Sequence, residues 1–167
     1  MEEHAVRAWF DGRLPEAWSV EAPEVAVDRD EIVVVVPLGE PEGADAAGGW
    51  RAACIACVQR FREETRDTRM RIAEQAEHRF GRKVSWGAEC GDVRVIFTHL
   101  SVPVMTRLRM PEREVLDTLV QASVARSRSE ALAWCVRLVG QHQGEWIGQL
   151  KAALRQVEKV RSEGPAA

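Results

Sequence analysis

The 167-residue sequence predicts an α+β fold with several parts. Three observations lead to this prediction. Apolar, β-branched runs alternate with turn residues in the first hundred positions, while residues 50–80 hold helix formers without Pro or Gly. Near residue 106 the apolar period changes from two to about 3.6, the change expected where a strand passes into helices. The predicted domains are a small α+β domain at 1–100, a strand-helix-helix segment at 101–144, and a terminal helix with a tail at 145–167.

The first 38 residues are predicted to be β-rich after a short start, with a turn at Trp9–Gly12. A β-hairpin is predicted from two apolar runs, Val25–Val27 and Ile32–Val36, that flank the polar residues 28–31. The second run is apolar at every position, so we expect that strand to be buried on both faces.

One long helix is predicted from Trp50 to Phe80, ended by Gly81. Two further strands are expected at Val84–Trp86 and Val93–Thr98, around a turn at 87–91. The order of two strands, a helix and two strands indicates a helix packed on a mostly antiparallel sheet.

Arginines and acids alternate at pairing distances along Arg60–Arg71 of this predicted helix. Such a face is usually solvated and carries weak pairs between side chains one turn apart. We therefore prefer a solvated face over a ligand-binding or nucleic-acid-binding role.

Cys54 and Cys57 are separated by two residues, a spacing that suits a tetrahedral zinc site or a redox pair. Cys90 and His99 could complete a set of four metal ligands. Against this, both cysteines lie in an apolar helical stretch, where Cys behaves as a small hydrophobic residue. Core packing is the preferred interpretation, with metal binding and redox chemistry as alternatives, and no cofactor is expected.

Several broad classes are not expected from the composition. No run of about 18 apolar residues is present, so we expect no membrane span. The polar, acidic start at Glu2–His4 is unlike a secretory signal. Four irregularly placed cysteines do not form a disulfide framework, so a reducing cytoplasm is the expected location.

The net charge of −3 is unevenly distributed between the two halves. Residues 1–100 carry 13 Lys+Arg and 19 Asp+Glu, a net of −6, and residues 101–167 carry 10 and 7, a net of +3. Because phosphate binding depends on local positive charge, the C-terminal part is the part expected to face a nucleic acid. Twenty of the 23 basic residues are Arg, which suits bidentate recognition but also follows from GC-rich coding.

A short strand is predicted at Thr106–Met110, where apolar side chains alternate with Arg107 and Arg109. Pro111 ends the strand and fits the first turn of a helix. The following helix has its apolar positions at Val115, Leu116, Leu119 and Val120.

A break at Ser123–Arg126 precedes a second helix. Ser127 and Glu130 have the spacing of a capping box, in which Ser127 caps the helix and Glu130 reaches back. A last helix is predicted at Trp146–Val160, whose apolar stripe packs on its own protein or pairs in a dimer. The apolar face of the second helix consists of Leu132, Cys135, Val136 and Val139.

This order resembles the ribbon-helix-helix family of DNA-binding proteins, the family of the Arc, MetJ and CopG-like regulators. The residues that carry the resemblance are the strand MTRLRMP, the first helix EREVLDTLV, and the turn with the second helix ARSRSEALAWCVRLV. The resemblance covers about residues 104–142. The family usually has Gly in the turn between the helices, where this chain has Ala125.

The resemblance implies a homodimer or higher oligomer in which this strand pairs antiparallel with the same strand of a second copy. Thr106, Leu108 and Met110 would then face the helices, while the opposite side chains enter the DNA major groove. The residues expected to contact bases are Met105, Arg107 and Arg109. The residues expected to contact phosphate at the start of the second helix are Ser127, Arg128 and Ser129.

The expected function is therefore a cytoplasmic, nucleoid-associated, sequence-specific transcriptional regulator that binds double-stranded DNA as a dimer, most simply as a repressor. The alternative is an antitoxin or a DNA-bound assembly or partition protein, whose N-terminal half binds a protein partner or an unidentified ligand. An enzyme is not expected, because the sequence has no Ser/His/Asp set, phosphate loop or carboxylate pair in a suitable context.

Overall fold

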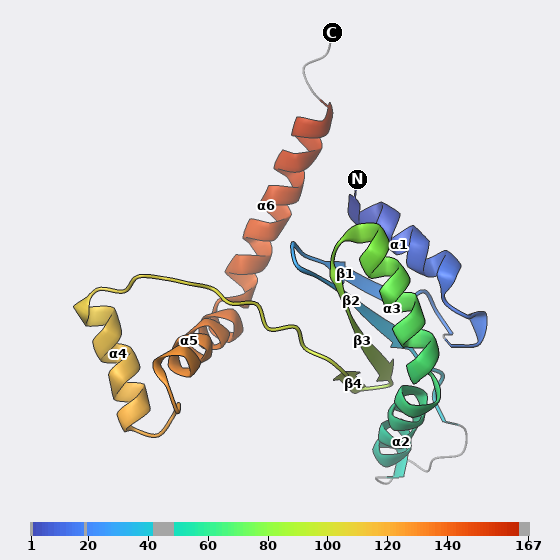
Figure 1. The fold of residues 1–167 in the computed structure, drawn as a ribbon, viewed down its shortest axis with the longest axis horizontal. Helices are drawn as coiled ribbons and strands as arrows, with labels where there is room; N and C mark the ends of the chain where they lie inside the picture. The colour runs from blue at the N-terminus through green and yellow to red at the C-terminus, as the bar shows by residue number, and fades with distance from the viewer. Residues whose placement is uncertain (1, 19, 42–48, 164–167) are drawn as a thin grey trace. The chain divides into compact units, whose positions relative to one another are not determined.

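A computed structural model of the chain describes residues 2–18, 20–41 and 49–163. The chain forms two compact units, Met1–Pro103 and Val104–Ala167, which are described separately here as unit 1 and unit 2 (Figure 1). Within the described ranges, no helix has both the length and the apolar character needed to cross a membrane.

Unit 1 contains a four-stranded sheet in the order β1-β2-β3-β4. β1 and β2 pair antiparallel, as do β3 and β4, while the central pair β2 and β3 is parallel. The predicted hairpin and the mostly antiparallel sheet are thus confirmed. The strand bounds are Glu24–Val27, Glu31–Pro37, Lys83–Cys90 and Val93–Ile96.

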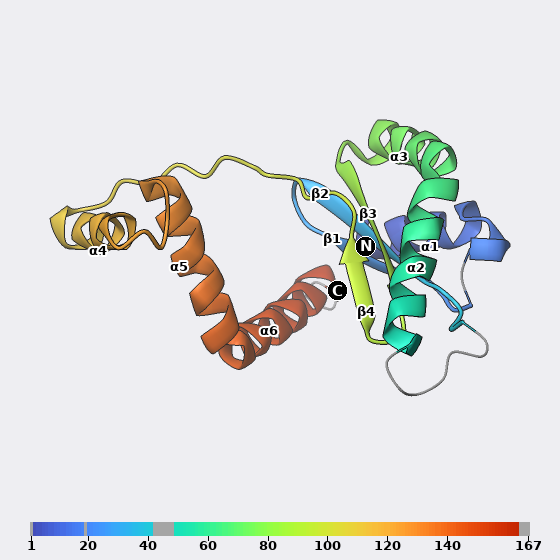
Figure 2. The same cartoon turned by 90° about the horizontal axis from the view of Figure 1, so that it is seen from below.

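Three α-helices of unit 1 pack on one face of this sheet (Figure 2). Alternate strand residues such as Val25, Val34 and Trp86 point to this face and are buried against Phe10 of α1 and Ile72 of α3. The helix bounds are α1 Glu2–Arg13, α2 Gly49–Glu64 and α3 Arg66–Phe80, with a short 3₁₀ turn η1 at Glu16–Trp18.

Two local predictions for unit 1 are wrong. The turn expected at Trp9–Gly12 lies inside α1, because Val6 and Phe10, one helical turn apart, are both fully buried. The single helix expected from residue 50 to residue 80 is broken at Thr65. The Thr65 hydroxyl donates to the Phe61 carbonyl oxygen at 2.5 Å, and this local side-chain bond competes with a straight helix.

The predicted turn at residues 87–91 is shorter than expected, because β3 continues through Gly87 to Cys90. A Cβ on Gly87 would lie 2.8 Å from the Val95 carbonyl oxygen, so glycine permits the close approach of β4. The chain reverses at Gly91, whose φ of +56° is left-handed. Gly81 ends α3 in the left-handed conformation, as predicted.

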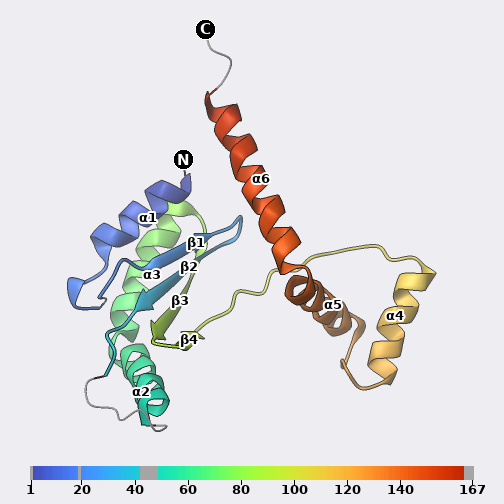
Figure 3. The same cartoon turned by 180° about the vertical axis from the view of Figure 1, so that it is seen from behind.

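Unit 2 consists of an irregular segment, residues 104–109, followed by α4 Met110–Gln121, α5 Arg128–His142 and α6 Gly144–Glu163. The three predicted helices are confirmed, and α6 extends away from α4 (Figure 3). The strand predicted at Thr106–Met110 is not formed in the single chain, since no strand among the described residues lies beside it to supply the hydrogen bonds that a strand needs. A C-terminal strand-helix-helix is therefore not present as such.

The turn between α4 and α5 differs in detail from the expected one. The residue in the left-handed region is Ser123, with a φ of +59°, and not Ala125. Ala125 is buried beside Leu116 and Ala131, so its methyl group fills the small core of unit 2. Ser123 is not branched at Cβ, so the left-handed conformation costs it less than it would cost a β-branched residue.

Candidate nucleic-acid interface

Unit 2 buries very little of its apolar surface. Its described core consists of three buried side chains, Leu116, Ala125 and Ala131, with half-buried neighbours around them. A domain of about 60 residues normally buries roughly 60% of its chain surface, so this core is small for the length. The large apolar side chains of unit 2 that are exposed are Val104, Met105, Met110, Val115, Val124, Val136, Val139, Trp146, Leu150, Leu154, Val157 and Val160.

The segment at residues 104–109 lies against α4 and α5 through one side chain. Leu108 is half-buried and packs on the small core, while Arg107 and Arg109 are exposed on either side of it. Arg113 of α4 holds this segment, because its Nη1 donates to the Leu108 carbonyl oxygen at 2.8 Å. Of the three side chains predicted to face the helices, only Leu108 is half-buried in the single chain; Thr106 and Met110 are exposed.

A groove of about 350 Å³ lies between this segment and the two helices. It brings Met105 together with Arg128 and Ser129, so members of the two predicted DNA-contacting groups share one groove. Arg107 and Arg109 are not among its lining residues. The lining residues are Val104, Met105, Thr106, Leu108, Arg113, Leu116, Arg128, Ser129 and Leu132.

The start of α5 is capped by Ser127, whose Oγ accepts from the Glu130 N–H at 3.2 Å. Glu130 reaches back one residue further than a capping box requires, because its Oε2 accepts from the Arg126 N–H at 2.8 Å. In the described part of unit 2, the N–H groups of Arg128 and Ser129 donate to no acceptor. Two N–H groups at the positive end of a fifteen-residue helix can hold an anion.

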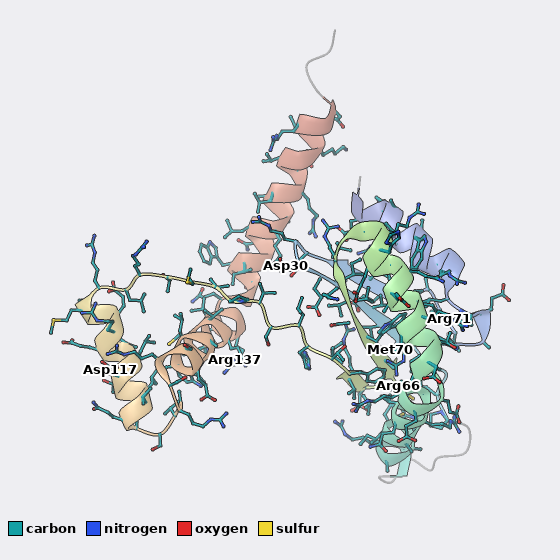
Figure 4. All side chains as sticks on the ribbon, viewed as in Figure 1. Asp30, Arg66, Met70, Arg71, Asp117 and Arg137 are labelled. Carbon is teal, nitrogen blue, oxygen red and sulfur yellow. The ribbon has the colours of Figure 1, made fainter. Side chains whose placement is uncertain are left out.

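An ion pair that the sequence did not reveal joins α4 to α5 at this point. The Arg128 guanidinium donates from Nε and Nη2 to the two carboxylate oxygens of Asp117, each at 2.6 Å. The same contact holds the pKa of Asp117 below its usual value. Asp117 and Arg128 lie eleven positions apart in the sequence, on either side of a turn, so no helical spacing indicates that they meet. Figure 4 shows Asp117 on α4.

Comparisons with known proteins divide the chain at about the same place as its two units. The model of the Rv1265-like protein, N-terminal domain, matches residues 4–96, and the model of the Mb1296 C-terminal domain matches residues 109–161. The chain belongs to the Rv1265-like protein family. The second match begins at Arg109, after most of the segment at 104–109. Neither family description states a function or names a ribbon-helix-helix fold.

Mycobacterial relatives match almost the whole chain. The protein described as Uncharacterized protein Rv1265 of Mycobacterium tuberculosis is 55% identical over 157 residues, which is 94% of this chain and 69% of the relative. Uncharacterized protein Mb1296 of Mycobacterium bovis matches with the same identity and coverage. No solved structure matches the chain significantly.

If unit 2 binds DNA as the ribbon-helix-helix resemblance implies, Asp117→Asn is expected to strengthen that binding. The change removes a carboxylate beside the start of α5 and releases the Arg128 guanidinium for a phosphate. One added phosphate contact should raise affinity at low salt by roughly threefold to tenfold, and should steepen the dependence of log K on log salt by about 0.9. Fluorescence anisotropy with a labelled duplex at several salt concentrations measures both quantities. Weaker binding with unchanged helicity would show that the ion pair positions the interface.

The structure gathers three of the four residues proposed as metal ligands. Cys54 and Cys90 are buried and Cys57 is half-buried, whereas His99 is exposed. Burial, together with the neighbouring thiols of Cys54 and Cys57, raises the pKa of the Cys90 thiol to about 12. Among the described residues, no group of three or more His, Cys, Asp or Glu side chains has an arrangement that could hold a metal ion.

The cysteines of the native protein are expected to differ in reactivity at pH 8. A shift of the Cys90 pKa from 9.0 to about 12 leaves about a thousandfold less thiolate, the reactive form. A maleimide or an aromatic disulfide should therefore label the half-buried Cys57 and Cys135 first, and Cys54 and Cys90 only on unfolding. Mass spectrometry of timed samples measures the order, with Cys57→Ser as the control. Labelling of Cys90 as fast as that of Cys57 would contradict the buried thiol.

Proposed function

We propose that this chain is a sequence-specific DNA-binding transcriptional regulator that acts as a homodimer. In this proposal the segments at residues 104–109 of two copies pair as an antiparallel ribbon, and the ribbon enters the DNA major groove. Bound at a promoter, such a dimer represses most simply by excluding polymerase, and it is associated with the nucleoid.

The observation that carries the proposal is the large exposed apolar surface of unit 2. Its small buried core and its many exposed apolar side chains require a partner, because exposed apolar patches of this extent mark association surfaces. A second copy is the partner that an unpaired segment favours, since two such segments related by a two-fold axis satisfy one another's backbone groups.

Alternation within the segment supports a DNA-reading role for the outer face of that ribbon. Leu108 packs inward in the single chain, and its neighbours Arg107 and Arg109 are exposed. Pairing would keep both guanidinium groups on the outer face, where an Arg can contact the O6 and N7 atoms of guanine. Met105 is 97% exposed and could contact a thymine methyl group there.

The start of α5 supports the positioning of a phosphate next to the same ribbon. Arg128 and Ser129, whose N–H groups are unpaired in the described part of unit 2, line the same groove as Met105 and Leu108. Contacts of this kind fix the register of a protein on DNA without reading its sequence. The net charge of +3 for residues 101–167 adds the local positive field that DNA association needs.

A selection from fragmented genomic DNA tests this function directly. The tagged full chain is mixed with the fragments, washed at increasing salt, and the retained DNA is sequenced. The expected result is a single enriched sequence with two-fold symmetric half-sites. Equal retention of all fragments, or none, in a preparation that is folded by circular dichroism would contradict sequence-specific binding.

A further inference from the structure

Three arginines gather where α2 meets α3 in unit 1: Arg62, Arg66 and Arg69, called here the arginine cluster. The Arg62 and Arg69 guanidinium carbons lie 5.7 and 4.9 Å from the centroid of the same aromatic ring, that of Phe97. Arg66 lies between them in sequence, at the first residue of α3, and Figure 4 labels it there.

Arg69 is the buried member of the cluster, with 6% of its surface exposed. Its Nε donates to the Thr65 hydroxyl at 2.9 Å, and its Nη2 donates to the Arg62 carbonyl oxygen at 2.6 Å. These two bonds fix the plane of the guanidinium at the break between the helices. Nη1 donates to no acceptor in the described residues, so both of its N–H groups remain available.

The guanidinium groups of the cluster form few ion pairs with the acids beside them. Within the described ranges, Arg62 and Arg69 form no ion pair, and Arg66 pairs only with the exposed Asp67 at 3.7 Å. Burial lowers the pKa of Arg69, and the charges of Arg62 and Arg66 lower it further. Buried charges in proteins are normally paired, so an unpaired guanidinium beside two like charges favours an anion at this point.

We propose that the arginine cluster binds a phosphate group carried by a small molecule. Guanidinium groups match the geometry of phosphate oxygens and bind them through paired N–H donors. Arg69 would supply the fixed donor at Nη1, and the exposed Arg62 and Arg66 would close over the anion from the sides.

A small ligand fits this site better than a nucleic-acid backbone does. Arg69, which supplies the fixed donor, is buried, whereas a duplex contacts basic side chains that project from the surface. The acids Glu63, Glu64 and Asp67 are exposed between the arginines of the cluster, and residues 1–100 carry a net charge of −6. This acidic surface repels each phosphate of a DNA backbone that passes over it, whereas a small ligand brings only one phosphate group.

Thermal unfolding of the full chain tests the site, with inorganic phosphate and ribose 5-phosphate as separate probes and sodium chloride of matched ionic strength as the reference. Ligand bound to the folded state alone raises the unfolding temperature as its concentration rises. The expected result is a rise with phosphate that chloride does not reproduce. A stronger effect of the sugar phosphate identifies a phosphate ester as the ligand; equal effects identify the free anion.

Substitutions in the arginine cluster test whether the rise in unfolding temperature with phosphate depends on these residues. Arg62→Gln and Arg66→Gln each remove one exposed guanidinium without touching the clamp made by Arg69, and each should weaken the apparent affinity about tenfold. Arg71→Gln is the matched control, because Arg71 also lies on α3 (labelled in Figure 4) but comes five residues after Arg66 and therefore on a different side of the helix. Unchanged phosphate affinity in both cluster variants, or an equal loss in Arg71→Gln, would overturn the proposal.

Binding to a DNA duplex of random sequence is measured last, to distinguish a small-ligand site from a DNA contact. The duplex affinity of Arg62→Gln and Arg66→Gln is expected to equal that of the unsubstituted chain, since the cluster holds a small ligand. If both variants lost duplex binding in parallel with phosphate binding, the cluster would be a DNA contact and the proposal would be wrong.

Discussion

Val136→Glu is expected to yield a monomer that has lost specific DNA binding. Val136 lies on α5 and is 65% exposed in the single chain, on the apolar face that a second copy would cover. Burial of a carboxylate in an apolar interface costs on the order of several kcal/mol, and a symmetric dimer would bury two of them. Light scattering at micromolar concentration should report about one chain mass for the variant and at least two for the unsubstituted protein.

Gln141→Glu serves as the matched control for this result. Gln141 is exposed on the same helix, five residues further on and therefore on a different side. The control adds the same charge to α5 and should remain dimeric and bind DNA. A dimeric Val136→Glu protein would show that this face of α5 is not the interface, and a monomeric unsubstituted protein would remove the basis for the ribbon.

Arg107→Ala and Arg109→Ala should each weaken binding to the specific site by about 1–3 kcal/mol, which is roughly 5-fold to 150-fold. The physical reason is the loss of bidentate contacts to guanine, so the preference for that base should relax as well. Both side chains are exposed and make no hydrogen bond or ion pair in the described chain, so helicity and dimer mass should not change.

Competition binding with the specific site and with random DNA separates base reading from phosphate contact. A loss confined to the specific site supports base contacts by Arg107 and Arg109. An equal loss on both DNAs would make these arginines phosphate contacts. Arg155→Ala on α6 removes one exposed positive charge elsewhere in unit 2 and measures how much of any loss is due to net charge alone.

The parts of the fold that sequence reasoning predicted are those decided by local patterns. The hairpin follows from two β-branched runs around a polar turn, and α4 and α5 follow from Pro111, Ser127 and the helical period. The helix break at Thr65 was not predicted, because it involves neither Gly nor Pro. It depends on the hydrogen bond from the Thr65 hydroxyl and on the hydrogen bond from Arg69 to the Arg62 carbonyl oxygen. The parallel pairing of β2 with β3 was also missed, since it depends on contacts between residues far apart in sequence.

In the candidate sites, too, the features set by local sequence patterns could be predicted, and those set by contacts between distant residues could not. The exposed positions of Arg107 and Arg109 and the cap at Ser127 could be expected from alternation and spacing. The ion pair of Asp117 with Arg128 could not, because it joins two helices across a turn. Arg69 was expected on a solvated face, yet it is buried, because the helix break turns its side chain over the Phe97 ring.

The parallel β2–β3 pair has a consequence for the order in which the chain folds. These strands are joined by the whole of α2 and α3, so Glu31 meets Lys83 only after a crossover of about fifty residues has closed. Closure of a loop of that length slows folding, whereas α4 and α5 form from near neighbours in sequence. During synthesis unit 1 must wait for β3 to leave the ribosome, and in the proposed homodimer unit 2 must also wait for a second chain. Maturation of the proposed dimer would therefore have a slow step that is independent of concentration and a later step that depends on concentration.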